Sequence, residues 1–269
     1  MRSSRETFCR VVVGAVLALF ARGPLFAQAK GAATAPTTSR ETGVSVPFVG
    51  CASTGQVERL EAPKGRPRSV PIGTEEAQAL AYYKSADGIG LLAPRGWHCE
   101  GASGSGGTAL YLSPDPIHRD FSGWHGLKGP AIEIEHMDGG TSGRYGVARG
   151  MLRAFPAYRA FAVRILKDME IPIPTGPYPK DTLTYRGKKI VEYRTPAQTE
   201  GLGNFESSLG KNDLPVNGAV IILGDIDGPP SGVDPPDLEL LSVRFPPALS
   251  GLIPVIINQF ERDTVGARR

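Results

Sequence analysis

The stretch AIEIEHM, residues 131–137, decides the fold class of this chain. Its apolar and polar residues alternate, and a period of two predicts a β-strand with two chemically different faces. Ile132, Ile134 and His136 share one face of this strand. Glu133 and Glu135 share the other, about 7 Å apart. The strand therefore predicts a sheet with one apolar face and a pair of carboxyl groups on the opposite face.

Further strands are predicted on both sides of this stretch. The segments between them contain turn signals, such as the Pro and Gly of residues 93–96 and the Gly/Ser-rich residues 101–107, which we expect to be a loop. A hairpin is expected to turn at Gly187. The predicted strands cover residues 88–93, 108–112, 182–186, 189–195, 219–223 and 238–245.

Four helical segments are expected, at residues 74–84, 142–155, 156–168 and near the C-terminus. Thr74 and Ser142 are expected N-caps, and Pro254 is expected to open the terminal helix. Phe161 and Ile165 should be buried. Residues 61–71 and 169–180 contain several prolines and are expected to be a loop and an extended connector.

Because the helices and strands do not alternate regularly, the sequence predicts an α+β fold, an α/β/α sandwich around a mainly antiparallel sheet. No polar linker divides the chain into two cores, so residues 43–269 should form a single domain. Residues 30–42 are small, polar and interrupted by proline, which predicts a flexible lead-in.

Residues 1–29 have the pattern of a secretory signal peptide. Three arginines precede the apolar run 11–21, and Ala27 and Ala29 supply the small residues of a cleavage site after Ala29. A run of 11 apolar residues is too short to cross a bilayer. We therefore expect a periplasmic or secreted protein whose mature chain has no transmembrane anchor.

Two cysteines, Cys51 and Cys99, would remain in the mature chain. In an oxidising compartment they should form a disulfide, worth about 4 kcal/mol for a loop of this length. The alternatives are free buried thiols and a metal site that uses Cys99 beside His98.

The charge of the chain is unevenly distributed. The whole chain has a formal charge of +3, but the mature chain would be neutral, which argues against nucleic-acid binding. Residues 143–168 contain six bases and one acid, whereas residues 192–239 contain nine acids and two bases. The basic segment predicts binding to an anionic envelope component; the alternative is that its arginines pair with the acidic loops or with water. The candidate binding residues are Arg144, Arg149, Arg153, Trp97 and Trp124.

The candidate catalytic groups are Glu133 and Glu135, as general acid and base, with His136 or His98. A zinc site formed by His136, His98 and Glu100 or Asp138 is a further alternative, although the four histidines (98, 118, 125 and 136) lack the usual metal-binding spacings. No cofactor is expected. The serine-rich loop matches neither a nucleophile elbow nor a phosphate-binding loop, and residues 224–237 (GDIDGPPSGVDPPD) predict a solvated acidic loop or a weak Ca²⁺ site.

Four segments resemble those of uncharacterised exported bacterial proteins: GIGLLAPRGWHC (88–99), GGTSGR (139–144), RTPAQTEGLG (194–203) and SVRFPP (242–247). The order of elements is similar to that of PsbP-like sandwich proteins, which are mostly non-catalytic accessory or binding proteins. The resemblance implies an exported, non-enzymatic accessory or binding domain of the cell envelope. The alternative is an envelope hydrolase that uses the candidate catalytic groups.

Overall fold

The computed structural model describes residues 43–56, 58–117, 126–167, 170–224 and 236–266. The predicted signal peptide, the lead-in, Trp124, His118, His125 and residues 225–235 of the acidic loop lie outside the described residues. Residues 41–269 belong to one compact unit.

The centre of the fold is a large sheet, to which nine strands of the described chain contribute. All neighbouring strands are antiparallel except the pair β3–β8, which is parallel. In spatial order the strands are β11 (Thr182–Arg186), β12 (Ile190–Thr195), β13 (Val216–Leu223), β14 (Asp237–Arg244), β10 (Ala131–Met137), β9 (Gly107–Ser113), β8 (His98–Gly104), β3 (Ser53–Thr54) and β4 (Arg59–Leu60).

Two smaller sheets accompany the large one. One sheet contains β2 (Phe48–Cys51), β6 (Leu80–Ser85) and β7 (Leu91–Pro94), with β6 in the middle, and the other contains β1 (Val44–Val46) and β5 (Arg68–Val70). The pair β2–β6 is parallel, and the pairs β6–β7 and β1–β5 are antiparallel.

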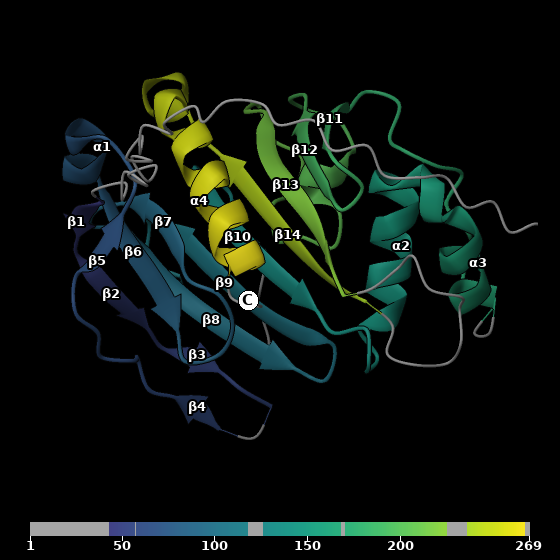
Figure 1. The fold of residues 1–269 in the computed structure, drawn as a ribbon, viewed down its shortest axis with the longest axis horizontal. Coiled ribbons are helices and arrows are strands. Elements are labelled where there is room, and N and C mark those ends of the chain that lie inside the picture. The colour runs from purple at the N-terminus through teal and green to yellow at the C-terminus, as the bar shows by residue number, and fades with distance from the viewer. Residues whose placement is uncertain (1–42, 57, 118–125, 168–169, 225–235, 267–269) are drawn as a thin grey trace, which may run out of the picture. The chain divides into compact units, whose positions relative to one another are not determined.

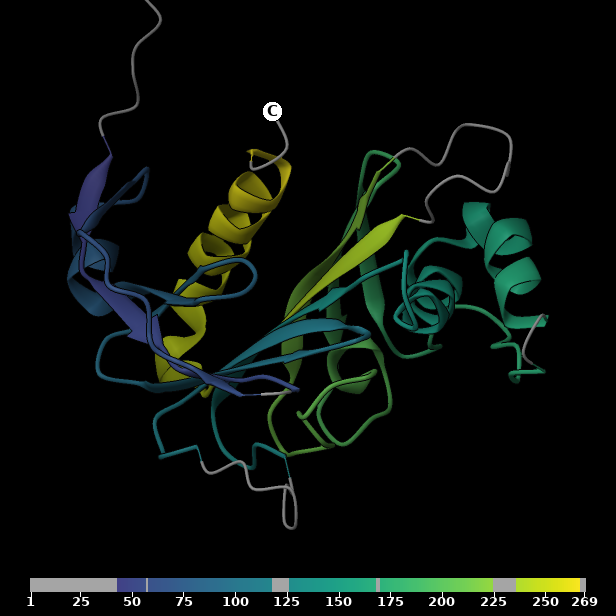
Figure 2. The same ribbon diagram turned by 90° about the horizontal axis from the view of Figure 1, so that it is seen from below.

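Helices cover both faces of the large sheet. In Figures 1 and 2, α4 lies on one side of the long strands, and α2 and α3 lie on the other. The helices are α1 (Thr74–Ala79), α2 (Arg144–Ala154), α3 (Arg159–Lys167) and α4 (Ile253–Gly266), with short 3-10 helices at Pro156–Tyr158, Leu202–Asn204 and Pro247–Leu252.

Each face has its own apolar core. Ile132 and Ile134 of β10 pack with α4 and the small sheet β2–β6–β7, whereas Met137 packs with α2 on the opposite face. These layers confirm the predicted α+β sandwich around a mainly antiparallel sheet. The pleat of β10 follows the alternation of AIEIEHM, so the two faces differ chemically as expected.

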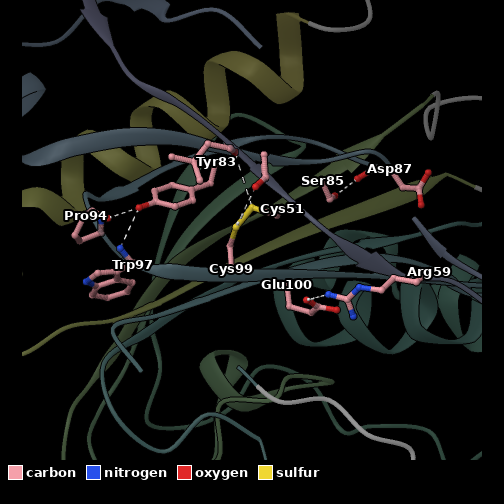
Figure 3. Close-up of a disulfide and its surroundings, with 11 residues drawn as sticks. Cys51, Arg59, Tyr83, Ser85, Asp87, Pro94, Trp97, Cys99 and Glu100 are labelled. Carbon is pink, nitrogen blue, oxygen red and sulfur yellow. Dashed lines mark hydrogen bonds and ion pairs between the residues drawn. A yellow bond between two sulfur atoms is a disulfide. The ribbon is translucent and has the colours of Figure 1, made fainter. Parts of the chain in front are cut away.

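The predicted disulfide is present. Cys51 and Cys99 are bonded, with their Cα atoms 5.4 Å apart, and the bond connects β2 of the small sheet to β8 of the large sheet (Figure 3). Beside it, the buried Tyr83 hydroxyl donates to the carbonyl of Pro94 at 2.8 Å and accepts from the Trp97 amide at 3.1 Å. The small sheet is therefore fixed to the large one covalently and by a buried hydrogen-bonded tyrosine.

The strands at 131–137 and 182–186 have the predicted bounds, and the other predicted strands overlap with observed ones. Several local predictions are wrong. Residues 80–84, predicted as the end of a helix, belong to β6, because the run Leu80–Tyr83 is buried between β2 and β7 and a short apolar run does not distinguish a helix from a central strand.

Further errors concern a loop, the phase of a helix and two helix caps. Most of the predicted loop 101–107 belongs to the ladder of β8 and β9, which pair as far as Gly104 and Gly107. In α3, Ala162 and Leu166 are buried, whereas the predicted Phe161 and Ile165 are only partly buried. Of the predicted caps, neither forms: Gly73 and Gly143 occupy the N-cap positions of α1 and α2.

Candidate functional site

A row of polar side chains crosses the large sheet on the face that α2 covers. The strand register places one residue from each of six neighbouring strands side by side. In order from β8 to β12, the row contains Glu100, Tyr111, Glu133, Ser242, Gly218 and Tyr193.

The two ends of this row have internal partners. Glu100 accepts hydrogen bonds from Arg59 and Thr54, both at 3.0 Å. At the other end, the Tyr193 hydroxyl lies 2.6 Å from the Ser242 hydroxyl and donates to the carbonyl of Leu241 at 2.9 Å. The ends of the row therefore stabilise the sheet, and the candidate chemistry lies at its centre.

Glu133, at the centre, is only 1% exposed. Its Oε2 atom accepts hydrogen bonds from the Ser207 hydroxyl at 2.6 Å and from the Ser208 amide at 2.8 Å. Its carboxyl group is also hydrogen-bonded to that of Glu135. Burial raises the pKa of Glu133 to about 7, although the hydrogen bonds from Ser207 and Ser208 favour the charged form.

Glu135 lies in the next row of the same face and reaches a cavity. Burial and the charges of Glu133 and Glu206 raise the pKa of Glu135 well above its ordinary value. Two neighbouring buried carboxyl groups cannot both ionise easily, so the pair retains a proton near neutral pH.

The cavity beside Glu135 has a volume of about 570 Å³. Its floor is formed by small residues of β8 and β9, including Ala102 and Ala109, which leave space above the sheet. Arg149 of α2 and Glu206 lie at its wall and form an ion pair at 2.6 Å. Glu206 has a positive φ of 49°, which is uncommon for a residue with a side chain and often occurs at functional sites.

His136 is among the residues that line the cavity beside Glu135, whereas His98 is not. His136 lies on the α4 face, where its Nδ1 atom is 2.9 Å from Glu239 Oε1, and this hydrogen bond raises the pKa of His136. His98 is exposed at the start of β8 and pairs with Ser113, so it lies in a different row from Glu133.

The alternative zinc site is not formed either. Glu100 is hydrogen-bonded on the α2 face, whereas His136 points to the opposite face. Within the described residues, no group of three His, Cys, Asp or Glu side chains could hold a metal ion.

The predicted arginines differ in their environments. Arg144 is exposed and lies over the ring of Tyr145, to whose hydroxyl it donates at 2.7 Å. Arg149 pairs with an acidic loop through Glu206, the alternative that the sequence left open. Trp97 packs edge-on against Phe245 at 5.5 Å, which gives it a place in the core.

Arg153 borders a second cavity, of about 460 Å³, and its guanidinium lies 4.1 Å from the centre of the Tyr178 ring. One guanidinium nitrogen donates to the carbonyl of Gly176 at 2.8 Å, whereas the buried Nε has no hydrogen-bond partner in the described chain. Lys180 and Lys211 line the same cavity and are exposed. We call this cavity, with Arg153, Lys180 and Lys211, the basic pocket.

The three cations of the basic pocket form no ion pair with any residue that the structure describes. One carboxylate, Glu200, is among the lining residues. Lys180 and Lys211 were not among the predicted binding residues. The available signal was that Lys211 is one of two bases in the acidic segment 192–239.

The fold and the site together define an α+β sandwich with two polar cavities that border α2. Comparison of the chain with protein-family models, with curated proteins and with solved structures gives no match. None of the helices in the described ranges is long and apolar enough to span a membrane.

Proposed function

We propose that this protein is an exported, non-enzymatic binding domain of the cell envelope that holds an anionic group in the basic pocket. The observation that carries the proposal is the cavity itself, where Arg153, Lys180 and Lys211 converge without a carboxylate partner among the described residues. The pattern of residues 1–29 and the Cys51–Cys99 disulfide support export to an oxidising compartment.

The chemistry of the pocket suits phosphate or carboxylate groups. A guanidinium offers several N–H donors in one plane, and Tyr178 and the Gly176 carbonyl hold that of Arg153 in position. Lys180 and Lys211, on two other segments, add positive charge, and their exposed side chains can adjust to the ligand. Arg144 and Arg149 are not required, because each already contacts a neighbouring side chain.

The test measures binding of the oxidised chain to inorganic phosphate by calorimetry, and to vesicles of phosphatidylglycerol or phosphatidylcholine by flotation. We expect binding to the anionic probes, weakened about 10- to 100-fold by Lys180→Ala with Lys211→Ala, as for the loss of charge-assisted hydrogen bonds. The matched control, Lys64→Ala with Arg66→Ala, removes the same charge at exposed positions and should retain binding. No binding to either anionic probe, or equal loss in both double variants, would exclude the proposal.

The second candidate is a hydrolase that uses Glu133 and Glu135. The raised pKa of each carboxyl, with Glu135 at a cavity, favours it, because a general acid must hold its proton near neutral pH. It would have to work without His98 and with the Nδ1 atom of His136 bound to Glu239. A screen of chromogenic esters, phosphoesters and glycosides tests it: turnover that Glu135→Gln abolishes would favour the hydrolase over the binding domain.

A further inference from the structure

The cavity beside Glu135 is separate in its chemistry from the basic pocket. Its volume of about 570 Å³ is in the range of cavities that hold small organic ligands. Ala102, Ala109 and Gly107 form a small-residue floor, and Tyr111 and Tyr145 add aromatic surface. The cavity therefore suits a ligand with an apolar or aromatic body.

The ionisable side chains that line this cavity include Glu135, Glu206, Arg149 and His136, and the Nδ1 atom of His136 is 2.9 Å from Glu239 Oε1. The carboxyl groups of Glu133, Glu135 and Glu206 interact with one another, and Arg149 is paired with Glu206 at 2.6 Å. The next cation on this face, Arg244, is buried and donates to three backbone carbonyls of neighbouring loops. The Glu133–Glu135 pair thus has no cation bonded to it among the described residues.

Glu133 and Glu135 are hydrogen-bonded to each other. Glu133 is 1% exposed and its Oε2 receives the hydrogen bonds from Ser207 and Ser208, whereas Glu135 lines the cavity. Glu135 therefore connects the buried carboxyl group to the cavity. A cationic donor that binds Glu135 would stabilise the ionised form of both carboxyl groups.

From this geometry we infer that the cavity is a second ligand site, which binds a small organic cation with its ammonium or guanidinium group between Glu135 and Glu206. The described residues supply no three-ligand set for a metal ion, so a cation that forms directional N–H bonds fits the site better. Tyr145 and Tyr111 would contact the body of the ligand, and the aromatic faces would favour a cation nearby.

Binding of the cation should release a proton. The carboxyl pair holds a proton near neutral pH, and a cation beside it stabilises the fully ionised pair. The ligand therefore replaces the proton, and its affinity should increase as the pH rises from 6 to 8. His136, which lines the same cavity and whose pKa the hydrogen bond to Glu239 raises, loses positive charge as the pH rises and changes the affinity in the same direction.

The experiment uses 2-phenylethylammonium as the probe, with 2-phenylethanol as its neutral and 3-phenylpropionate as its anionic counterpart. Calorimetry at pH 7 in two buffers of different ionisation enthalpy measures both affinity and protons released. We expect binding of the cation alone, with release of up to one proton per ligand. Equal binding of the neutral alcohol, or cation binding without proton release, would overturn the inference.

Variants locate the site. Glu135→Gln should weaken binding of the cation at least 10-fold, and Glu206→Gln provides a second variant at the more exposed end of the site. The control Glu200→Gln removes a carboxylate at the basic pocket and should leave cation binding unchanged. Thermal unfolding of each variant reports whether it is folded, and equal loss in Glu135→Gln and Glu200→Gln would refute the assignment.

The two sites can fail independently. Lys180→Ala with Lys211→Ala should weaken phosphate binding about 10- to 100-fold and leave the binding of 2-phenylethylammonium intact. Glu135→Gln should weaken the binding of 2-phenylethylammonium at least 10-fold and leave phosphate binding intact. No heat with any of the three phenyl probes would overturn this inference and leave the proposed function standing.

Discussion

Replacement of Glu133 by Gln should change how the stability of the protein depends on pH. The glutamine carbonyl can still accept the hydrogen bonds from Ser207 and Ser208, so the fold should be retained. Because the folded-state pKa of Glu133 is raised from 4.5 to about 7, its carboxyl favours folding fully below pH 4.5, and this contribution is lost as the pH rises through 7. A pKa difference of this size corresponds to about 3 kcal/mol. The free energy of unfolding of Glu133→Gln, relative to that of the wild type, should therefore increase by about 3 kcal/mol between pH 4.5 and pH 8.

The assay is urea denaturation of the oxidised wild type and Glu133→Gln at half-unit steps from pH 4.5 to 8.5. Groups that do not interact with Glu133, such as Asp263, are present in both proteins and cancel in the difference. Glu135 does not cancel: loss of the Glu133 charge lowers its pKa, which changes the difference in the same direction. Substitution of the exposed Glu61 by Gln is the matched control and should give a constant difference from wild type. A constant difference for Glu133→Gln as well, or one that changes in the opposite direction, would refute the interpretation of Glu133 as a desolvated, proton-binding group.

Three further predictions concern the framework around the site. Replacing Cys51 and Cys99 by Ala should lower the unfolding free energy by about 4 kcal/mol, as expected for a bridge of sequence separation 48, measured against the oxidised wild type in urea. Gly218→Ala should lower the free energy of unfolding by about 3 kcal/mol or more, because a Cβ there would lie 1.8 Å from a backbone carbonyl oxygen of β14. A decrease below about 1 kcal/mol would contradict this close approach. A double-mutant cycle for Arg149 and Glu206 should give a coupling of at most about 1 kcal/mol, since about a third of each side chain is exposed; a coupling above 2 kcal/mol would contradict it.

The long strands could be predicted because they carry strong local signals. The alternation of AIEIEHM, the apolar run of β13 and the glycine turn of the β11–β12 hairpin indicate strands without information from the rest of the fold. Residues 80–85 gave no such signal. Their assignment depends on β2 and β7, which flank them in the small sheet, and a local pattern carries no information about these neighbours.

The site was predictable only in part, for a similar reason. The parity of β10 correctly separates His136 from Glu133 and Glu135, but the sequence could not indicate that Ser207 and Ser208 would cover Glu133. That contact spans more than 70 residues and depends on how the segment after β12 folds back over the sheet. The raised pKa of each carboxyl is a consequence of this tertiary cover, so it could not be derived from spacing alone.

The pleat of β10 also limits the chemistry available to the protein. Because side chains alternate along a strand, the ring of His136 bonds Glu239 on the α4 face, although His136 is also among the residues that line the cavity beside Glu135. On the α2 face, the carboxyl pair is surrounded by the groups that α2 and the Glu206 segment supply, which are arginine, tyrosine and backbone amides. None of these is a base near neutral pH, whereas together they can hold charged ligands. The alternation in residues 131–137 therefore favours the binding of charged ligands on the α2 face over hydrolysis at that face.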